Sequence, residues 1–443
     1  QYCPQHTLGR FRITLRTGTK PGDGIPANIV SILKTEPAKR TDKERDALLE
    51  YIAGQDDAAT ELAAQLDALK KKAPASPTMS VRVIAQRSNN PRTTRILERG
   101  DFLRPTDPVK GDTLEVLHEF DPRDDGPAAE LGGDRLDLAR WLVDEDNPLT
   151  PRVAVNDIWQ HLFGEGLVRT VDDFGVRGEK PTHPKLLDWL AAEYIRRGWS
   201  RKAMIKLIVT SQTYQQSSRH RPELNEIDPE NRLLHRQNRF RVEAEIVRDI
   251  SLAASGLLSG KVGGPSVFPP LPPDVAALSY ANNFKWNTSK GEDRYRRGMY
   301  TFFKRTAPHP NLMTFDCPDS NTTNVERTIS NTPLMALTTL NNITFVEASQ
   351  ALAARIVTST HETDDARLRY GFRLCVARPP TESELSGFRD LLTRSRAWYE
   401  SHPDEAKKLT AAHAPQGVER AEAAAWVVVA RVLLNMDEFL TRE

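Results

Sequence analysis

Three successive segments between residues 151 and 213 repeat apolar residues at the helical spacing, and this pattern constrains the fold more than any other. The first segment places Val155, Ile158, Trp159 and Phe163 on one face, and Gly164 ends it. Helices with one apolar face bury that face by packing against one another. The stretch therefore predicts the core of a mainly α-helical domain.

The boundaries of the other two helices follow from capping and turn residues. We expect Thr182 to be the N-cap of the second helix, with Pro184 in its first turn and Gly198 at its end. Ser200 is expected to cap the third helix.

A further helix is predicted over residues 241–258. Its expected buried stripe consists of Ile246, Ile250, Ala253 and Leu257. Charged residues at spacings of three or four can pair along a helix, and we interpret those of this segment in that way. They are Arg241, Glu245, Arg248 and Asp249.

The polar loop between the first two helices holds the candidate catalytic residues. A carboxylate pair can act as acid and base in glycoside hydrolysis if the fold brings the two groups within about 5–10 Å. With 60 acidic residues such a pair also arises by chance, and a histidine beside a helix-starting proline is more often a packing or capping residue. Whether the chain is an enzyme stays open on this evidence. The candidates are Asp172, Asp173, Glu179 and His183.

Two other polar stretches supply candidate ligand-binding residues. Aromatic and cationic side chains interleave over residues 282–305, which is typical of a platform for a sugar or an anion, or of amphipathic packing. Residues 309–342 contain a second polar loop, and we expect its residues 316–327 to face residues 172–183 across a common cleft. The candidate ligand-binding residues are Arg241, Trp286, Tyr295, Arg297, Lys304, Arg305, Asp316 and Arg327.

Composition and cysteine spacing exclude several classes of partner. The 61 Lys and Arg against 60 Asp and Glu leave a formal net charge of +1, so the overall charge provides no attraction to nucleic acid. No apolar run reaches the roughly 18 residues of a membrane span. Cys3, Cys317 and Cys375 show no metal-ligand or haem-attachment spacing, so we expect no metal site and no cofactor within this chain. Cys375 is expected to be a free buried thiol, and Cys3 is either free or paired with a residue upstream.

The first 73 residues divide into two predicted parts. Residues 1–35 include the alternating run 6–16, which predicts a strand, and they are interpreted as the end of an upstream β-rich region. Residues 36–73 have the helical period, broken near Gly54, and predict a helical hairpin. Its dense charge favours a solvated spacer over a partner-binding role.

Residues 74–130 complete a small α+β segment. Two short strands are predicted at 79–87 and 93–102, where they could pair, followed by a linker rich in Pro, Gly and Asp. Asp134 is expected to cap the first helix of an α-helical domain over residues 131–443.

Eight segments in order along the chain carry a family resemblance. They are RLDLARWL (135–142), NPLTPRVAVNDIWQHLFGEGLV (147–168), DDFGVRGEKPTHPKLLDWLA (172–191), LIVTSQTYQQSS (207–218), GEDRYRRGMYTFFKRTAPHP (291–310), TFDCPDSN (314–321), NTPLMALTTLNN (331–342) and LLNMDEFLTRE (433–443). On these motifs the chain resembles a family of exported proteins, mainly of planctomycetes, with a C-terminal planctomycete-specific (PSD) domain of unknown function. Relatives tend to have a Cys and a run of Arg where this chain has NTTNVER.

The resemblance implies an exported protein, periplasmic or at the cell surface, made as a longer precursor with a signal peptide. A cytochrome c-like domain and a second planctomycete-specific domain often precede the matching part, so a haem is expected only upstream of this chain. The missing N-terminal portion of the same precursor is then an expected partner. The family implies no reaction.

Two functions from different classes remain. The first is a module that binds or processes an extracellular polysaccharide, with an anionic group on the polymer held by the cations of residues 282–305. The second is a structural or interaction module that supports the cytochrome-like upstream domain. A pocket that joins Trp286 or Tyr295 to the loop carboxylates would favour the first, and a large flat apolar face would favour the second.

Overall fold

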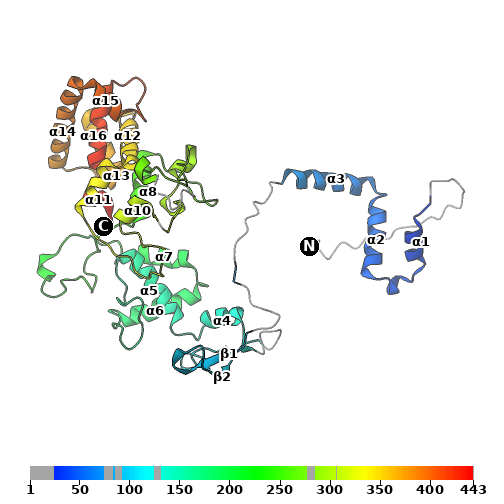
Figure 1. Ribbon diagram of the computed structural model, residues 1–443. Helices are drawn as coiled ribbons and strands as arrows, with labels where there is room; N and C mark the ends of the chain where they lie inside the picture. Colours follow the sequence, from blue (N-terminus) through cyan, green and yellow to red (C-terminus); the bar gives the residue numbers. More distant parts are fainter. Residues whose placement is uncertain are drawn as a thin grey trace. The chain divides into compact units, whose positions relative to one another are not determined.

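The computed structural model describes residues 24–73, 83–84, 92–123, 131–276, 285–305 and 307–442. The chain divides into two compact units, residues 1–87 and residues 88–443. Helices dominate the described residues of both units, which confirms the predicted fold class (Figure 1). The strand predicted over residues 6–16 and the thiol of Cys3 lie outside the described residues.

The first unit contains three α-helices: α1 (Ala27–Lys34), α2 (Asp42–Ala53) and α3 (Asp57–Lys72), with a 3-10 turn at Pro37–Lys39. The two helices predicted on either side of Gly54 are thus present, while α1 was not predicted. Thr41 and Glu44 form a capping box that starts α2, and Asp56 caps α3. No residue of α2 or α3 is buried in the described part of this unit, and α2 packs against α1.

The second unit begins with a two-stranded antiparallel sheet. Strand β1 (Thr94–Leu97) falls in the predicted run 93–102 and pairs with β2 (Pro105–Val109), placing Thr94 opposite Val109. A 3-10 turn at Glu98–Gly100 follows β1. The partner β2 was assigned to the linker in the sequence analysis. Most of the predicted strand 79–87 lies outside the described residues, and Val83 and Ile84 form no strand.

Four helices then form the first part of the α-helical region: α4 (Arg135–Leu142), α5 (Thr150–Phe163), α6 (Pro184–Arg196) and α7 (Arg201–Val209). Asp134 caps α4, Gly164 ends α5 with φ of +87°, and Ser200 caps α7, all as predicted. The N-cap of α6 is His183, not Thr182, because the first helical hydrogen bond runs from the Leu187 N–H to His183 O, at 3.0 Å.

The helices α5, α6 and α7 bury the predicted apolar stripes in one cluster. Val155, Ile158, Trp159 and Phe163 of α5 meet Leu187, Leu190, Ala191 and Tyr194 of α6 and Met204 and Ile208 of α7. Burial of each such side chain is worth about 1.5–3 kcal/mol. This cluster fixes the end of α5, which lines the candidate site.

The remainder of the unit is built on α8 (Ala244–Ser255), which follows the short strand β3 (Phe240–Arg241). The other elements are Pro222–Leu224, α9 (Pro273–Ala276), Gly291–Tyr295, Gly298–Tyr300, α10 (Pro310–Thr314), α11 (Pro333–Asn341), α12 (Ile343–Val357), α13 (Asp364–Val376), α14 (Glu382–Ser401), α15 (Pro403–Leu409), α16 (Arg420–Leu433), α17 (Asp437–Leu440) and β4 (Thr441–Arg442). Strand β4 pairs antiparallel with β3, so Arg241 lies opposite Thr441.

The buried face of α8 differs from the predicted stripe. Val247, Ser251 and Leu252 are buried, whereas the predicted core residue Ala253 is exposed. The helix begins at Ala244 and not at residue 241, since Phe240 and Arg241 are held in a strand by β4. The charged residues Arg248 and Asp249 are consequently buried.

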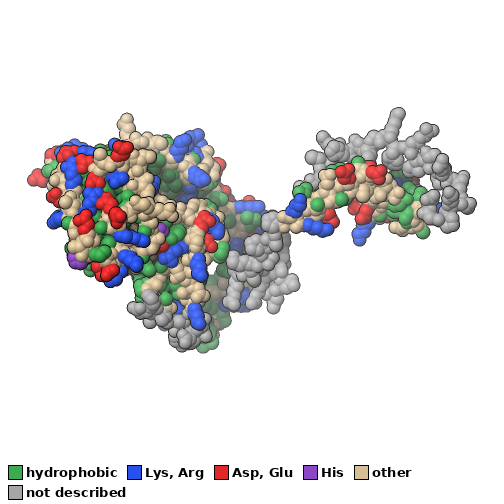
Figure 2. Space-filling model, turned by 90° about the horizontal axis from the view of Figure 1, so that it is seen from above, with side chains coloured by type: hydrophobic (Ala, Val, Ile, Leu, Met, Phe, Trp, Pro, Cys, Tyr) green, Lys and Arg blue, Asp and Glu red, His purple; other side chains and the backbone are tan. Residues whose placement is uncertain are grey.

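Two apolar clusters share α8. The larger cluster contains the fully buried Trp426 of α16 together with residues of α8, α12, α13 and α14. In the smaller, the start of α8 packs against Leu312 of α10, Phe315 and Phe345. Side chains of both charges are interspersed over the visible face of the helical unit (Figure 2), as the balanced composition predicts. None of the helices in the described part of the chain is long and apolar enough to cross a membrane.

Candidate functional site

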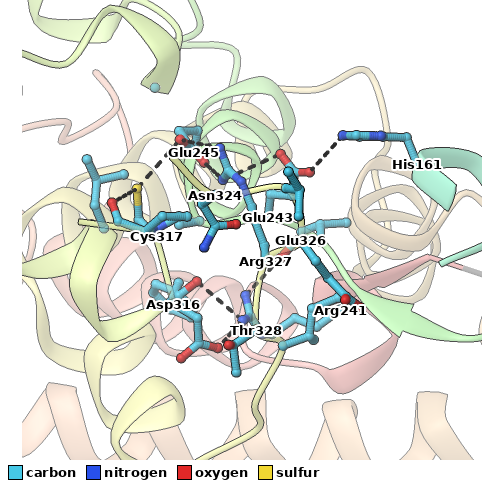
Figure 3. A pocket seen from close by; sticks show the side chains of 18 of the residues that line it. His161, Arg241, Glu243, Glu245, Asp316, Cys317, Asn324, Glu326, Arg327 and Thr328 are labelled. Carbon is cyan, nitrogen blue, oxygen red and sulfur yellow. Dashed lines mark hydrogen bonds and ion pairs between the residues drawn. The ribbon is translucent and has the colours of Figure 1, made fainter. Parts of the chain in front are cut away.

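A cleft with a volume of about 1050 Å³ is the candidate site. Its lining comes from the last two turns of α5, from residues 240–245 at the junction of β3 and α8, from residues 298–303, and from the loop of residues 315–329 (Figure 3). This volume is at the upper end of the range for small-molecule sites, about 300–1000 Å³. The cleft can therefore hold an extended ligand.

Arg241 on β3 anchors the long loop that forms one wall of the cleft. Its side chain is buried, and Nη2 donates to Asp316 Oδ2 at 2.6 Å while Nε donates to Ser330 O at 2.9 Å. Asp316 also accepts from the Ser330 N–H at 2.8 Å. Asp316 has φ of +61°, which is uncommon for a residue other than glycine. Both ends of the loop are thus tied to one buried guanidinium, a charge-assisted arrangement stronger than a neutral hydrogen bond.

A second arginine, Arg327, belongs to the loop itself and binds the first turn of α8. Arg327 Nη1 donates to Glu245 Oε2 at 2.7 Å and lies 3.6 Å from Glu243 Oε2. Burial acts to raise the pKa of Glu245, but the hydrogen bond and charge of Arg327, a backbone hydrogen bond and the Cys317 thiol together hold the pKa below its ordinary value. Glu245 is therefore a carboxylate at neutral pH.

The thiol of Cys317 is protonated rather than reactive. Burial and the neighbouring Glu245 carboxylate raise the pKa of Cys317 to about 11. Its Sγ lies 3.8 Å from Glu245 Oε1, to which it donates. A nucleophilic cysteine needs the opposite shift, so this thiol contributes packing and a weak hydrogen bond.

The end of α5 places His161 at the opposite rim. Its Nε2 lies 4.0 Å from Glu243 Oε1, and its Nδ1 lies 2.9 Å from Asp157 O in the preceding turn. More than half of the His161 side chain is exposed. The imidazole and the Glu243 carboxylate are thus accessible to a ligand in the cleft.

The walls combine aromatic faces with an acidic balance of charge. The half-buried rings of Phe240 and Phe303 line the cleft beside Asn324 and Glu326. Among the described residues of the lining, seven are Asp or Glu and two are Arg, so the formal charge is −5 with His161 neutral. In the part of the chain that the structure describes, no three His, Cys, Asp or Glu side chains are grouped so that they could hold a metal ion.

Comparison with protein-family models matches residues 134–392 to PSD1, a protein of unknown function (DUF1553). The match covers more than half of the chain. The chain belongs to this family. Neither the curated proteins nor the solved structures gave a match. Every residue that lines the cleft falls within the DUF1553 match, so the cleft lies in the family domain of this chain.

The loop of residues 172–183 does not line this cleft of the DUF1553 domain, and the predicted cleft between the two polar loops is wrong. The end of α5 occupies the place that this loop was expected to take. Asp172 is exposed, Asp173 Oδ1 accepts from the Gly175 N–H at 2.7 Å, and His183 lies at the start of α6. Glu179 pairs with Arg232 at 2.9 Å on the surface. These four catalytic candidates therefore stand apart from the cleft.

The predicted ligand-binding residues divide between the cleft and other places. Arg241, Asp316 and Arg327 line the cleft. Trp286 is half-buried, donates from Nε1 to Pro269 O at 2.7 Å and packs against Phe268 and His309.

Tyr295 and three cations of the same stretch also lie elsewhere. Burial raises the pKa of Tyr295, whose hydroxyl donates to Glu347 Oε1 at 2.8 Å. Arg297 lies 3.7 Å from Asp249, and neither Lys304 nor Arg305 belongs to the cleft lining. The aromatic and cationic residues therefore do not form one platform at this site.

Three cleft residues, His161, Phe240 and Glu243, were not expected from the sequence, whereas Phe303 belongs to the aromatic and cationic stretch of residues 282–305. His161 sits on the polar face of a helix recognised for its apolar stripe. Phe240 belongs to a strand of two residues, too short to show alternation, and Glu243 lies between that strand and α8. The sequence does place Glu243 and Glu245 together at the start of a helix. Carboxylates are common there because they interact favourably with the helix dipole, so this position alone does not indicate a binding site.

Proposed function

We propose that the DUF1553 domain binds a glycan in the cleft. The observation that carries this proposal is one cavity of about 1050 Å³ in which the half-buried rings of Phe240 and Phe303 meet exposed polar groups of Glu243, Asn324 and His161. Sugars present apolar ring faces and rims of hydroxyl groups, so a cleft that offers both half-buried aromatic rings and hydrogen-bonding side chains suits them.

The charges of the cleft favour a neutral or amine-bearing polymer over an anionic one. Arg241 and Arg327 are both compensated by carboxylates, and the lining as a whole is acidic. An anionic polymer would face repulsion from the uncompensated carboxylates. The expectation of an anionic substituent rested on Arg297, Lys304 and Arg305, which contribute nothing to this lining.

The place of action that we propose is outside the cytoplasm, in a longer protein. This rests on the resemblance to exported planctomycete proteins, in which a cytochrome c-like domain often precedes the PSD domain. The alternative function, an interaction module that supports such a domain, is favoured by the exposed Leu334 and Leu337 on α11.

Binding to four polysaccharides tests the proposal. The purified chain is run in affinity gels or titrated calorimetrically with a neutral β-glucan, chitosan, alginate and a sulfated dextran, and reducing ends are followed in the same samples. We expect binding to the neutral or amino polymer, weakened at least about tenfold by Phe240→Ala or Glu243→Gln because each removes a direct contact.

The matched control is Asp172→Asn, an exposed carboxylate outside the cleft. Binding that the cleft variants leave unchanged, or no binding to any of the polymers, would contradict the proposal and favour the interaction module. If the chain releases reducing ends from a polymer, and Glu243→Gln or Glu245→Gln abolishes that release, the cleft hydrolyses the polymer as well as binding it.

A further inference from the structure

The end of α5 carries backbone carbonyl groups that need partners from outside the helix. The last four carbonyls of an α-helix have no N–H partner within it. In α5 the first of the four accepts from the Gly164 N–H at 2.7 Å, and the last accepts from Asn238 Nδ2 at 2.8 Å. The two between them, His161 O and Leu162 O, both accept from Arg442 Nη2 on β4, at 2.7 and 2.6 Å. A cation at this end of a helix also interacts favourably with the helix dipole.

The same guanidinium lies over the ring of Phe240 on the neighbouring strand. Phe240 and Arg442 are partners across the β3–β4 pair, and Arg442 Cζ lies 4.4 Å from the centroid of the ring. An aromatic ring attracts a cation placed over its face, and the attraction grows where water is excluded. The ring also contacts the end of α5, because a Cβ added at Gly164 would lie 3.0 Å from Phe240 Cδ1. Arg442 therefore joins the aromatic ring to the end of the helix.

We propose that Arg442 is a positioning residue for the cleft. Its own side chain is not part of the lining, yet Phe240 and His161, the two residues that it joins, both line the cleft. Arg442 also lies outside the DUF1553 match, which ends at residue 392. Because this inference rests on the glycan binding proposed above, it predicts that the affinity for a glycan depends on a residue that does not touch the ligand.

Arg431 is a matched control because it has the same task at the end of another helix. Its Nε and Nη2 donate to Leu340 O in the last turn of α11, at 3.0 and 2.6 Å. Arg431 is half-buried, as Arg442 is, but neither Arg431 nor Leu340 lines the cleft. If Arg442 served stability alone, methionine at either position would affect binding equally.

The affinity of the full chain for the neutral β-glucan and for chitosan tests the inference. Methionine retains an unbranched apolar side chain and removes the charge and the donors. We expect Arg442→Met to weaken binding at least about fivefold, and Arg431→Met to leave it unchanged. Arg442→Lys, which keeps a cation with three donors, should restore most of the loss. Urea titration of the same variants shows that each is folded under the binding conditions.

A double-variant cycle shows whether Arg442 acts through the ring. If Arg442 positions Phe240, the change to methionine has less to disturb once Phe240 is alanine. The variant with both changes should then bind more tightly than the product of the two separate losses predicts. Losses that multiply independently would overturn the positioning of this ring by Arg442.

Hydrogen exchange separates a failure of this inference from a failure of the proposed function. Without the guanidinium, amides of residues 160–165 and 240–242 should exchange faster, with or without a polymer, whereas Arg431→Met should leave both segments unchanged. Unchanged exchange in Arg442→Met, or unchanged affinity for a polymer that the wild type binds, would overturn the positioning role and leave the glycan proposal intact. If no polymer binds, the proposed function fails, and the exchange measurement still decides whether Arg442 holds this wall of the cleft.

Discussion

Two polar loops of the DUF1553 domain look alike in sequence and are held in opposite ways. The loop of residues 172–183 is fixed by its own backbone and near neighbours: Thr170 Oγ1 donates to Asp173 O at 2.8 Å and accepts from the Glu179 N–H at 3.0 Å. The loop of residues 315–330 is fixed by Arg241 and by Glu245, which lie more than 70 positions away. The first is a local turn, and the second is a wall built by tertiary contacts.

The difference explains which loop forms a cleft. A locally closed loop satisfies its polar groups internally and needs no neighbour, so it can lie on the surface. A loop held by distant buried side chains is positioned against the elements that supply them, here β3 and the start of α8. Its remaining polar groups then face the space between those elements.

The largest expected effect is that of Arg241→Ala. The change removes hydrogen bonds to Asp316, Phe315 and Ser330 and leaves a partly buried carboxylate without its cation. We expect a loss of about 3 kcal/mol in unfolding free energy and faster hydrogen exchange across residues 315–330. Urea titration and exchange mass spectrometry measure both. A loss below about 1 kcal/mol would show that the loop does not depend on this anchor.

The loop of residues 172–183 should instead be destabilised by a side chain at Gly178. A Cβ at this position would lie 2.0 Å from Asp173 O, so Gly178→Ala forces the backbone of the turn to move. We expect about 1–3 kcal/mol of destabilisation, with faster exchange confined to residues 170–183. Gly175→Ala is the matched control, because its Cβ would meet only the Asp173 side chain, at 3.0 Å. Equal effects of the two changes would argue against a rigid turn.

Acid should destabilise the loop of residues 315–330 by protonating Glu245. Its pKa is lower in the folded state than the ordinary value of 4.5, so its ion pair with Arg327 stabilises the fold fully above about pH 4.5 and is lost as the pH falls through the folded pKa. We expect hydrogen exchange of residues 320–330 to rise in that window. The variant Glu245→Gln should already show fast exchange at pH 7 and little further change. An unchanged acid profile in this variant would assign the loosening to another group.

The smallest effect belongs to the ion pair on the surface of the local loop. Glu179 and Arg232 are 46% and 39% exposed, so solvent and salt screen their attraction. Arg232→Ala should cost less than about 1 kcal/mol, as measured by urea titration beside Arg241→Ala. A loss as large as that of Arg241→Ala would erase the proposed contrast between the two loops.

The sequence by itself determined the helices α5, α6 and α7, most of their ends and most of the apolar faces of the α5 cluster. These features depend on neighbours within about four residues, as with Ser200 at the start of α7 or Phe163 on the stripe of α5. The polar, non-periodic stretch of residues 309–342 supplied Asp316 and Arg327 as ligand-binding candidates, and both line the cleft, as does the candidate Arg241.

Only the tertiary structure decided which charges meet. Sequence spacing favoured pairing among Arg241, Glu245, Arg248 and Asp249, but that prediction is wrong for Arg241 and Glu245, whose partners are Asp316 and Arg327. The cause is that β4, at the far end of the chain, holds Arg241 in a strand and removes it from the helical spacing. Local periodicity reports short-range preferences, whereas the pairing of ions depends on which distant segments the buried apolar clusters bring together.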